Sequence, residues 1–253
     1  MMLYNERAEL ILQQLQLQST VKVTELSQQL GVSVDTIRRD LKAMEQEGLI
    51  KCVRGGACLP ESIISFSNFT GREIINSEWK REIARKALGY IREGDVVALN
   101  AGTTNTVLAQ ELITLNRKFT VVTNNHAAVS ILMQNPAIRL ISVGGEIDPQ
   151  EKSTFGTVCE REFGQYYPDI AFLSVNAVDS REGFTDFRFA EIGVIQLLAR
   201  ISRKVIALMD TSKLGKCSKR KALSLDQVDL LLMNDPVLEE VKEKYKKKGI
   251  EIL

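Results

Sequence analysis

The N-terminal part of the chain carries apolar side chains along one face of three short segments. Residues 3–17 predict an amphipathic helix. A second, shorter helix is predicted from Val23 to Leu30, because Gly31 is a typical residue to end a helix. Ser33 is a typical N-cap, and the apolar residues behind it predict a third helix that ends near Gly48.

Residues 49–59 follow these helices and are rich in β-forming side chains around Gly55-Gly56, which predicts a short hairpin. Three short helices and a hairpin are the outline of a winged helix-turn-helix. The next segment, 60–75, has Pro60, several Ser and Asn residues and no helical period, so it is predicted to be an inter-domain linker. Its apolar residues indicate that part of it packs against something.

From residue 76 onward, short apolar runs alternate with helical patterns. The predicted strands are 96–99, 119–122, 140–143, 170–175, 205–209 and 230–233. The predicted helices are 78–91, 104–115, 125–134, 187–201 and 236–247. This alternation is typical of a mostly parallel sheet with helices on both faces. We therefore predict a winged helix-turn-helix domain over residues 1–59, a linker over 60–75 and an α/β domain over 76–253.

The composition narrows the classes of protein that fit this pattern. The net charge is only +1, so nucleic-acid binding would have to come from a local basic patch. Four cysteines and the single histidine, His126, do not predict a structural metal site or any cofactor, and we expect reduced thiols. No apolar run approaches the roughly 20 residues that span a membrane. The charged N-terminus is unlike a signal peptide, so we expect a cytoplasmic protein with no membrane partner.

The third predicted helix is the candidate DNA-reading element, since the N-terminal residues of this helix enter the major groove in a helix-turn-helix. It carries two adjacent arginines, and either could form a bidentate pair with guanine. The candidate DNA contacts on this helix and on the hairpin are Ser33, Thr36, Arg38, Arg39, Lys42, Lys51 and Arg54. Residues 1–57 contain equal numbers of acidic and basic residues. The alternative to DNA binding is therefore that the charged side chains of this helix only face the solvent. The clustering of the cations on the third helix and the hairpin favours DNA binding.

The segment VSVDTIRRDLKAMEQEGLIKCVRGGA resembles the N-terminal motif of the DeoR family of bacterial transcription repressors. The resemblance covers about 26 residues and implies a winged helix-turn-helix that binds operator DNA. One departure is visible, because Arg54 stands where the family often has histidine. A cation at this position is expected to preserve a contact with the DNA backbone.

The strongest binding-site pattern in the second predicted domain is LNAGTTNTVLAQEL, at residues 99–112. An apolar strand ends at Leu99, and Gly102-Thr103-Thr104 then opens a helix. Glycine lets the backbone approach an anion closely, and the free N–H groups of the first helical turn, with two hydroxyls beside them, form a phosphate cradle. Capping of the helix by threonine is the alternative explanation.

Small and hydroxylated residues also follow the other predicted strands. They are Thr123-Asn124, Gly144-Gly145, Gly156 and the segment from Asp210 to Lys213. In open α/β sheets, ligands bind at the carboxyl ends of the strands. Lys213 adds a cation for a phosphate, so together these turns predict a site for a small anion.

This half of the chain also resembles the C-terminal domain of the DeoR family, in the segments EGDVVALNAGTT, VVTNN, ISVGG, DIAFLSVNAVD, EGFTD and ALMDTSKLG. The resemblance implies a fold similar to that of ribose-5-phosphate isomerase and a phosphorylated sugar as effector. The effector pocket that it implies consists of Asn100, Gly102, Thr103, Thr104, Thr123, Asn124, Gly145 and Lys213. Asn100 stands where the family commonly has aspartate, and Gly193 where many members have lysine, so both departures are expected to remove charge from that pocket.

The sequence thus favours a homo-oligomeric repressor (dimer or tetramer) that controls a carbohydrate-metabolism operon. Its binding to operator DNA is expected to be modulated by a phosphorylated sugar. Whether the sugar acts as inducer or co-repressor stays open. The alternatives are a sugar-phosphate isomerase-like enzyme with an appended helical domain, and a module in which the N-terminal helices only mediate oligomerisation. No catalytic residues are predicted, because the carboxylates Asp179, Asp186, Glu191 and Asp210 show no paired spacing.

Overall fold

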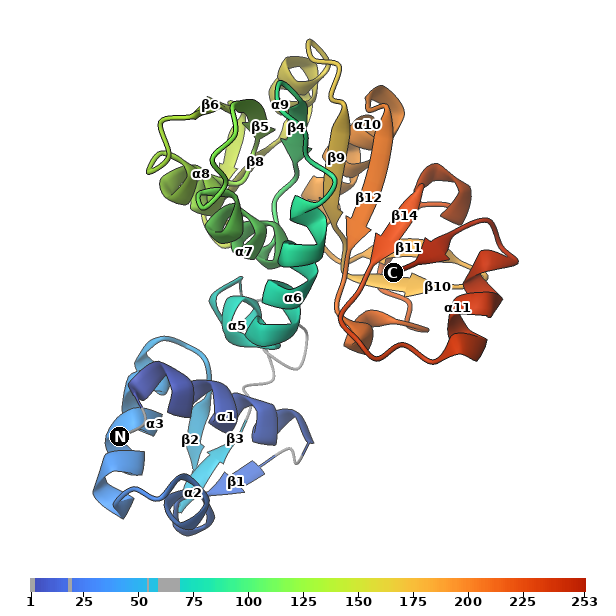
Figure 1. Ribbon diagram of the computed structural model, residues 1–253. Helices are drawn as coiled ribbons and strands as arrows, with labels where there is room; N and C mark the ends of the chain where they lie inside the picture. The colour runs from blue at the N-terminus through green and yellow to red at the C-terminus, as the bar shows by residue number, and fades with distance from the viewer. Residues whose placement is uncertain (1–2, 18–19, 54, 59–68) are drawn as a thin grey trace. The chain divides into compact units, whose positions relative to one another are not determined.

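The computed structural model describes residues 3–17, 20–53, 55–58 and 69–253. The chain divides into two compact units, Met1–Asn76 and Ser77–Leu253 (Figure 1). Within the described residues, no helix combines the length and the apolar character needed to cross a membrane. The same residues contain no group of three or more His, Cys, Asp or Glu side chains that could hold a metal ion.

The first unit is a winged helix-turn-helix. Its elements are α1 (Tyr4–Leu17), β1 (Thr20–Lys22), α2 (Val23–Leu30), α3 (Val34–Gln46), β2 (Lys51–Val53), β3 (Gly56–Cys58) and α5 (Phe69–Ile74). The three predicted helices and the hairpin are confirmed. Gly31 ends α2 in the left-handed conformation, with φ of 64°, and the Ser33 side chain accepts a hydrogen bond from the backbone N–H of Thr36 at the start of α3.

A third strand, β1, completes a small antiparallel sheet in the order β1-β3-β2. The sequence pattern had not predicted it, because three residues are too few to show an alternation. A Cβ atom at Gly56 would lie 1.9 Å from the carbonyl oxygen of Val21, so the pairing of β3 with β1 requires glycine at this position.

A buried ion pair joins α1 to α3. Arg7 donates from Nε to Asp40 Oδ2 at 2.7 Å and from Nη2 to Asp40 Oδ1 at 2.9 Å. Asp40 lies on the inner side of α3 with Ile37, Leu41 and Met44, all of which are buried. The pair therefore fixes the rotation of α3, with Arg38 and Arg39 on its exposed side.

The predicted linker, residues 60–75, is partly wrong. Residues 69–74 form helix α5, and Phe69 in this helix is fully buried. The burial of Phe69 agrees with the expectation that part of the segment packs. Residues 60–68 lie outside the described part of the chain.

The second unit contains a seven-stranded sheet in the order β15-β14-β12-β9-β4-β5-β6, and every pairing in it is parallel. Its strands are β4 (Val96–Leu99), β5 (Phe119–Thr123), β6 (Ile138–Ser142), β9 (Ile170–Ser174), β12 (Lys204–Leu208), β14 (Leu230–Leu232) and β15 (Glu251–Ile252). All six predicted strands are present, so the predicted α/β fold with a mostly parallel sheet is confirmed. The edge strand β15 was not predicted.

Helices cover both faces of this sheet (Figure 1). They are α6 (Ser77–Leu88), α7 (Thr103–Leu112), α8 (His126–Leu132), α9 (Gly156–Phe163), α10 (Ile192–Ile201) and α11 (Glu239–Lys246). Val97 and Leu99 of β4 pack in one apolar cluster with α6, α7 and α8. Ala98, which points to the opposite face, packs in a second cluster with α9, α10 and α11.

Helix α9 and two smaller sheets were not predicted from the sequence. One is a hairpin of β7 (Glu146–Asp148) and β8 (Ser153–Phe155), and the other contains β10 (Ala177–Asp179), β11 (Gly183–Asp186) and β13 (Arg220–Leu223). Their strands are only three or four residues long, and several of them are largely polar, so no period-two pattern marks them.

The order of the strands places a topological switch point between β4 and β9. From β4 the chain adds β5 and β6 on one side, and it then returns to add β9, β12, β14 and β15 on the other. Crossovers that leave in opposite directions open a crevice at the carboxyl ends of the two central strands, which is where open α/β sheets bind ligands. The turn at residues 100–102 follows β4 and therefore lies at this crevice.

Candidate functional site

The turn between β4 and α7 is shaped by Gly102. Its φ is 144°, and a Cβ atom there would lie 2.4 Å from Ser174 Oγ and 3.2 Å from Arg188 Nη1. Glycine is therefore required for the close approach of this turn to the end of β9. Gly102 is also the N-cap of α7, and no side chain caps this helix end. The alternative explanation of the motif, a threonine N-cap, is thus not realised.

The two threonines that follow are buried, at 3% exposure for Thr103 and 0% for Thr104. Thr104 Oγ1 has no hydrogen-bond partner among the described residues. Thr106, one turn later, is different because its hydroxyl donates to the Gly102 carbonyl and accepts from Asn125 Nδ2. A buried hydroxyl without a partner costs free energy, so Thr104 is the member of the turn that is suited to a ligand.

Asn100 joins the ends of the two central strands. Its Oδ1 accepts from the Ser174 backbone N–H at 2.8 Å, and its Nδ2 donates to the Ser174 carbonyl at 3.1 Å. Oδ1 also accepts from Asn105 Nδ2 at 3.0 Å. An ionised aspartate could not donate to the Ser174 carbonyl, which gives a structural reason for asparagine at this position.

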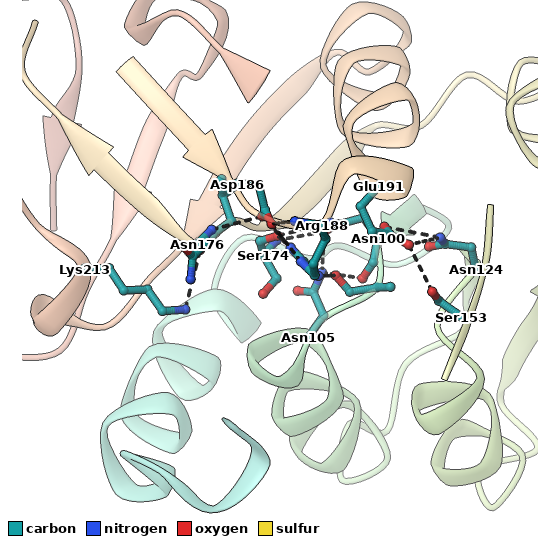
Figure 2. A network of polar contacts seen from close by, with 12 residues as sticks. Asn100, Asn105, Asn124, Ser153, Ser174, Asn176, Asp186, Arg188, Glu191 and Lys213 are labelled. Atoms are coloured by element: carbon teal, nitrogen blue, oxygen red, sulfur yellow. Dashed lines mark hydrogen bonds and ion pairs between the residues drawn. The ribbon is translucent and has the colours of Figure 1, made fainter. Parts of the chain in front are cut away.

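Arg188 lies at the centre of the polar network drawn in Figure 2. It forms a bidentate pair with Asp186, at 3.0 Å from Nε to Oδ1 and 2.7 Å from Nη2 to Oδ2. Nη1 donates to the Ala101 carbonyl at 2.7 Å, and the second N–H of Nη2 donates to the Ser174 carbonyl at 2.9 Å. Burial disfavours the charge of Arg188, but the neighbouring carboxylates outweigh it and raise its pKa. The sequence analysis had not selected Arg188.

Glu191 is buried on the side of the network that contains Asn124 and Ser153 (Figure 2). It accepts from Asn124 Nδ2 at 3.1 Å and from Ser153 Oγ at 3.0 Å. Burial raises the pKa of the Glu191 carboxyl to about 7, although the Arg188 charge and the hydrogen bonds from Ser153 and Asn124 act in the opposite direction. Asn124 also donates to the Thr154 carbonyl at 2.7 Å. Its Oδ1 has no partner among the residues that the structure describes.

Two other predicted pocket residues hold the backbone in place. Thr123 donates from Oγ1 to the Leu99 carbonyl at 2.8 Å and accepts from the Asn125 N–H at 3.0 Å, so it joins β5 to β4. Gly145 has φ of 148°, and a Cβ atom there would lie 2.6 Å from the Phe155 carbonyl oxygen. Both positions therefore support neighbouring turns at the carboxyl edge of the sheet.

Cationic side chains lie near the end of β12. Lys213 Nζ is 3.7 Å from Asp210 Oδ2 and 3.4 Å from the Val175 carbonyl oxygen. Burial opposes ionisation of Asp210, but Lys213, Ser212 and Lys80 keep its pKa below the ordinary value. Lys80 of α6 is itself buried, at 2% exposure, and the sequence analysis had not selected it. Figure 2 shows Lys213 at one end of the network, with Asn124 and Ser153 at the other.

Gly193 does not belong to this network. A Cβ atom at Gly193 would lie 2.0 Å from Glu160 Oε1, so the residue faces α9. It lines a surface hollow between α9 and α10, with Glu160, Arg161 and Arg200. The expectation that Gly193 removes charge from the effector pocket is therefore corrected, because a side chain at this position would start from the α9–α10 groove.

The candidate DNA contacts lie on α3 and the hairpin of the first unit. Arg38, Arg39, Lys42 and Lys51 are exposed, whereas Ser33 and Thr36 are engaged with each other at the start of α3. Arg38 forms a solvent-exposed pair with Asp35, at 3.3 Å. The side chain of Arg54 lies outside the described residues.

The raised pKa of Glu191 gives a testable dependence of stability on pH. Below the ordinary value of 4.5 the carboxyl is protonated in the folded and the unfolded chain. As the pH rises toward 7, the unfolded chain loses this proton first, so the folded state loses stability. Relative to Glu191→Gln, the free energy of unfolding of the wild type should fall by about 1–3 kcal/mol across this window. Urea unfolding followed by circular dichroism measures this difference, and parallel pH profiles of the two proteins would contradict the account.

Comparison with known proteins places both units in one family. The model of the DeoR-like helix-turn-helix domain matches residues 7–63, and that of the DeoR C-terminal sensor domain matches residues 75–235. The regulator GolR of Listeria innocua is 33% identical, over 98% of this chain and 97% of its own length. The glycerol-3-phosphate regulon repressor of Escherichia coli is 29% identical, over 87% of this chain and 86% of its own.

Similar solved structures have low sequence identity. Ribose 5-phosphate isomerase A of Methanocaldococcus jannaschii matches with a TM-score of 0.42 and 19% identity, over 55% of each chain. The β subunit of eIF2B from Chaetomium thermophilum matches with a TM-score of 0.48 and 15% identity, over 85% of this chain and 60% of its own. The matches to the two domain models, together with the similarity to GolR along nearly the whole length, show that the chain belongs to the DeoR family.

Proposed function

We propose that this protein is a transcription repressor of a carbohydrate-metabolism operon, and that a phosphorylated sugar changes its affinity for operator DNA. The observation that carries the effector part is the turn at the switch point, where Thr104 presents a buried hydroxyl with no partner among the described residues. Relatives named as the putative aga operon repressor and the glycerol-3-phosphate regulon repressor support the carbohydrate part of the proposal.

The phosphate is proposed to bind at the N-terminus of α7. The free backbone N–H groups of this helix end and the Thr104 hydroxyl are donors for an anion, and the helix dipole favours negative charge there. Lys213, near the end of β12 on the far side of β9, supplies positive charge. Gly102 and Thr103 complete the cradle, while Asn100, Thr123 and Gly145 are proposed to position it through their backbone contacts.

The isomerase-like alternative has less support. Asp186 is held in a bidentate pair with Arg188, so this carboxylate is not available as a free base. The relatives that match along nearly the whole chain are named as regulators.

The first unit is proposed to bind the operator through the exposed side of α3, with Arg39 and Lys42 toward the major groove and Lys51 of the hairpin toward the backbone. Helix-turn-helix proteins bind two half-sites as dimers, which is the reason to propose a homo-oligomer. Sedimentation equilibrium tests this part, and a monomer at all protein concentrations would contradict it.

Replacing Arg39 should reduce the sequence discrimination of the protein. For Arg39→Ala we expect specific binding to a DNA fragment from upstream of this protein's own gene to weaken by about 1–3 kcal/mol relative to non-specific DNA. Fluorescence anisotropy at fixed salt measures both affinities. Arg139→Ala, at an exposed position in the second unit, is the matched control. An equal loss on both DNAs, with a shallower salt slope, would instead indicate a phosphate contact.

Replacing Thr104 should separate effector binding from folding. Thr104→Val keeps the shape of the side chain and removes only the hydroxyl without a partner, so the melting temperature should stay within a few degrees of the wild type. The concentration of sugar phosphate that shifts operator binding should rise by about 10- to 100-fold. A panel containing ribose 5-phosphate, glucose 6-phosphate and glycerol 3-phosphate identifies the responding compound.

Thr114→Val is the control for this experiment, since Thr114 is an exposed threonine whose hydroxyl donates to the Glu111 carbonyl just after α7. It should leave the response to the sugar phosphate unchanged. An unchanged response of Thr104→Val would remove the proposed phosphate site, and the absence of any response in the wild type would remove the effector proposal itself.

A further inference from the structure

The Glu191 carboxylate receives hydrogen bonds only from neutral groups among the described residues, and the neighbouring acceptor, Asn124 Oδ1, receives none. The Glu191 side chain is buried, at 1% exposure, and its two donors are the amide of Asn124 and the hydroxyl of Ser153. No lysine or arginine nitrogen lies within ion-pair distance of Glu191 among the described residues. A buried carboxylate in such surroundings is stabilised when a cation binds beside it.

The charge of Arg188 acts on Glu191, but among the described residues its guanidinium does not hydrogen-bond to this carboxylate. Four of its five N–H donors bind Asp186 and the carbonyl oxygens of Ala101 and Ser174, at 2.7–3.0 Å. The guanidinium therefore holds the strand ends together, and the contact partners of Glu191 remain neutral.

Asn124 adds a second acceptor next to Glu191. Its Nδ2 lies between two acceptors, the Thr154 carbonyl at 2.7 Å and Glu191 Oε1 at 3.1 Å, which fixes the orientation of the amide. The opposite atom, Oδ1, is buried and has no donor among the described residues. The site thus offers a carboxylate and an amide oxygen together, both suited to a donor from a ligand.

The charges of the site are divided between its two ends. Two cationic side chains, Lys80 and Lys213, act on Asp210 at one end. At the other end, the carboxyl groups of Asp186, Glu191 and the buried Glu151 all act on the guanidinium of Arg188. A ligand with an anionic group at one end and a cationic group at the other complements this arrangement.

We propose that the effector is a phosphorylated amino sugar, with its phosphate at the N-terminus of α7 and its protonated amine at Glu191 Oε1/Oε2 and Asn124 Oδ1. An ammonium group carries three donors and a positive charge, whereas a sugar hydroxyl offers one donor and no charge. The inference rests on the proposed function, because it assumes the phosphate site, and it specifies the ligand class of that same site.

The test compares matched pairs of ligands on the full-length wild-type protein by isothermal titration calorimetry at pH 7. The pairs are glucosamine 6-phosphate with glucose 6-phosphate, and galactosamine 6-phosphate with galactose 6-phosphate. In at least one pair the amino compound should bind about 10-fold or more tightly than its hydroxyl counterpart, which corresponds to one charge-assisted contact. Inorganic phosphate reports on the phosphate site alone.

Glu191→Gln should abolish this preference, because the amide keeps the shape of the side chain and removes its charge. Its affinity for the hydroxyl compound should change less than its affinity for the amino compound. Glu160→Gln, which alters a carboxylate that faces Gly193 in the α9–α10 groove, is the matched control and should keep the preference.

The outcomes separate the two proposals. If the hydroxyl compounds bind as tightly as the amino compounds, or more tightly, the amine site is wrong while the proposed sugar-phosphate function stands. If Glu191→Gln keeps the full preference for the amino compound, the amine binds at another position and its assignment to Glu191 is wrong. If neither the sugar phosphates nor inorganic phosphate bind, the proposed function itself fails.

Discussion

The buried guanidinium of Arg188 holds together the region on which the rest of the sensor domain's site depends. It contacts the Ala101 carbonyl after β4, the Ser174 carbonyl at the end of β9, and the carboxylate of Asp186 in β11. The two central strands pair with each other as far as Leu99 and Phe172, and the connections that follow them leave toward opposite halves of the sheet. Arg188 and Asn100 join the strand ends, and the Gly102 turn can then lie directly against Ser174.

This arrangement explains why the donors and acceptors suited to a ligand lie where they do. Hydrogen bonds of Asn100 and Arg188 join the strand ends, whereas Thr104 Oγ1, Asn105 Oδ1 and Asn124 Oδ1 have no partner among the described residues. A scaffold that satisfies its own polar groups keeps the remaining ones in fixed positions, which lowers the entropic cost of binding. The site therefore combines a hydrogen-bonded centre with buried polar groups that are proposed to meet the phosphorylated ligand.

Much of this structure follows from local sequence patterns. Apolar runs and turn residues predicted six of the seven strands, the helices of the winged helix-turn-helix, and the Gly102-Thr103-Thr104 turn. Ser33 and Gly31 were predicted correctly at the helix ends because capping involves only near neighbours. The patterns failed for β1, β7 and β10, since three residues do not establish a period.

The residues that organise the site could not be predicted in the same way. Arg188 and Ala101 are 87 positions apart, and Asn124 and Glu191 are 67 apart. Such contacts depend on the order of the strands, which hydrophobic periodicity does not specify. Gly193 was assigned to the pocket from the family resemblance alone, and a resemblance in sequence does not show that the residue faces Glu160.

Regulation of operator binding by a sugar phosphate requires a coupling free energy between the two units. The most direct measurement is the dissociation constant of the responding sugar phosphate, determined on the full-length protein with and without saturating operator DNA. Linkage requires that the operator change the sugar-phosphate affinity by the same factor as the sugar phosphate changes the operator affinity, typically about 5- to 150-fold. Equal factors are the predicted result. A sugar-phosphate affinity that is the same with and without operator would contradict the account.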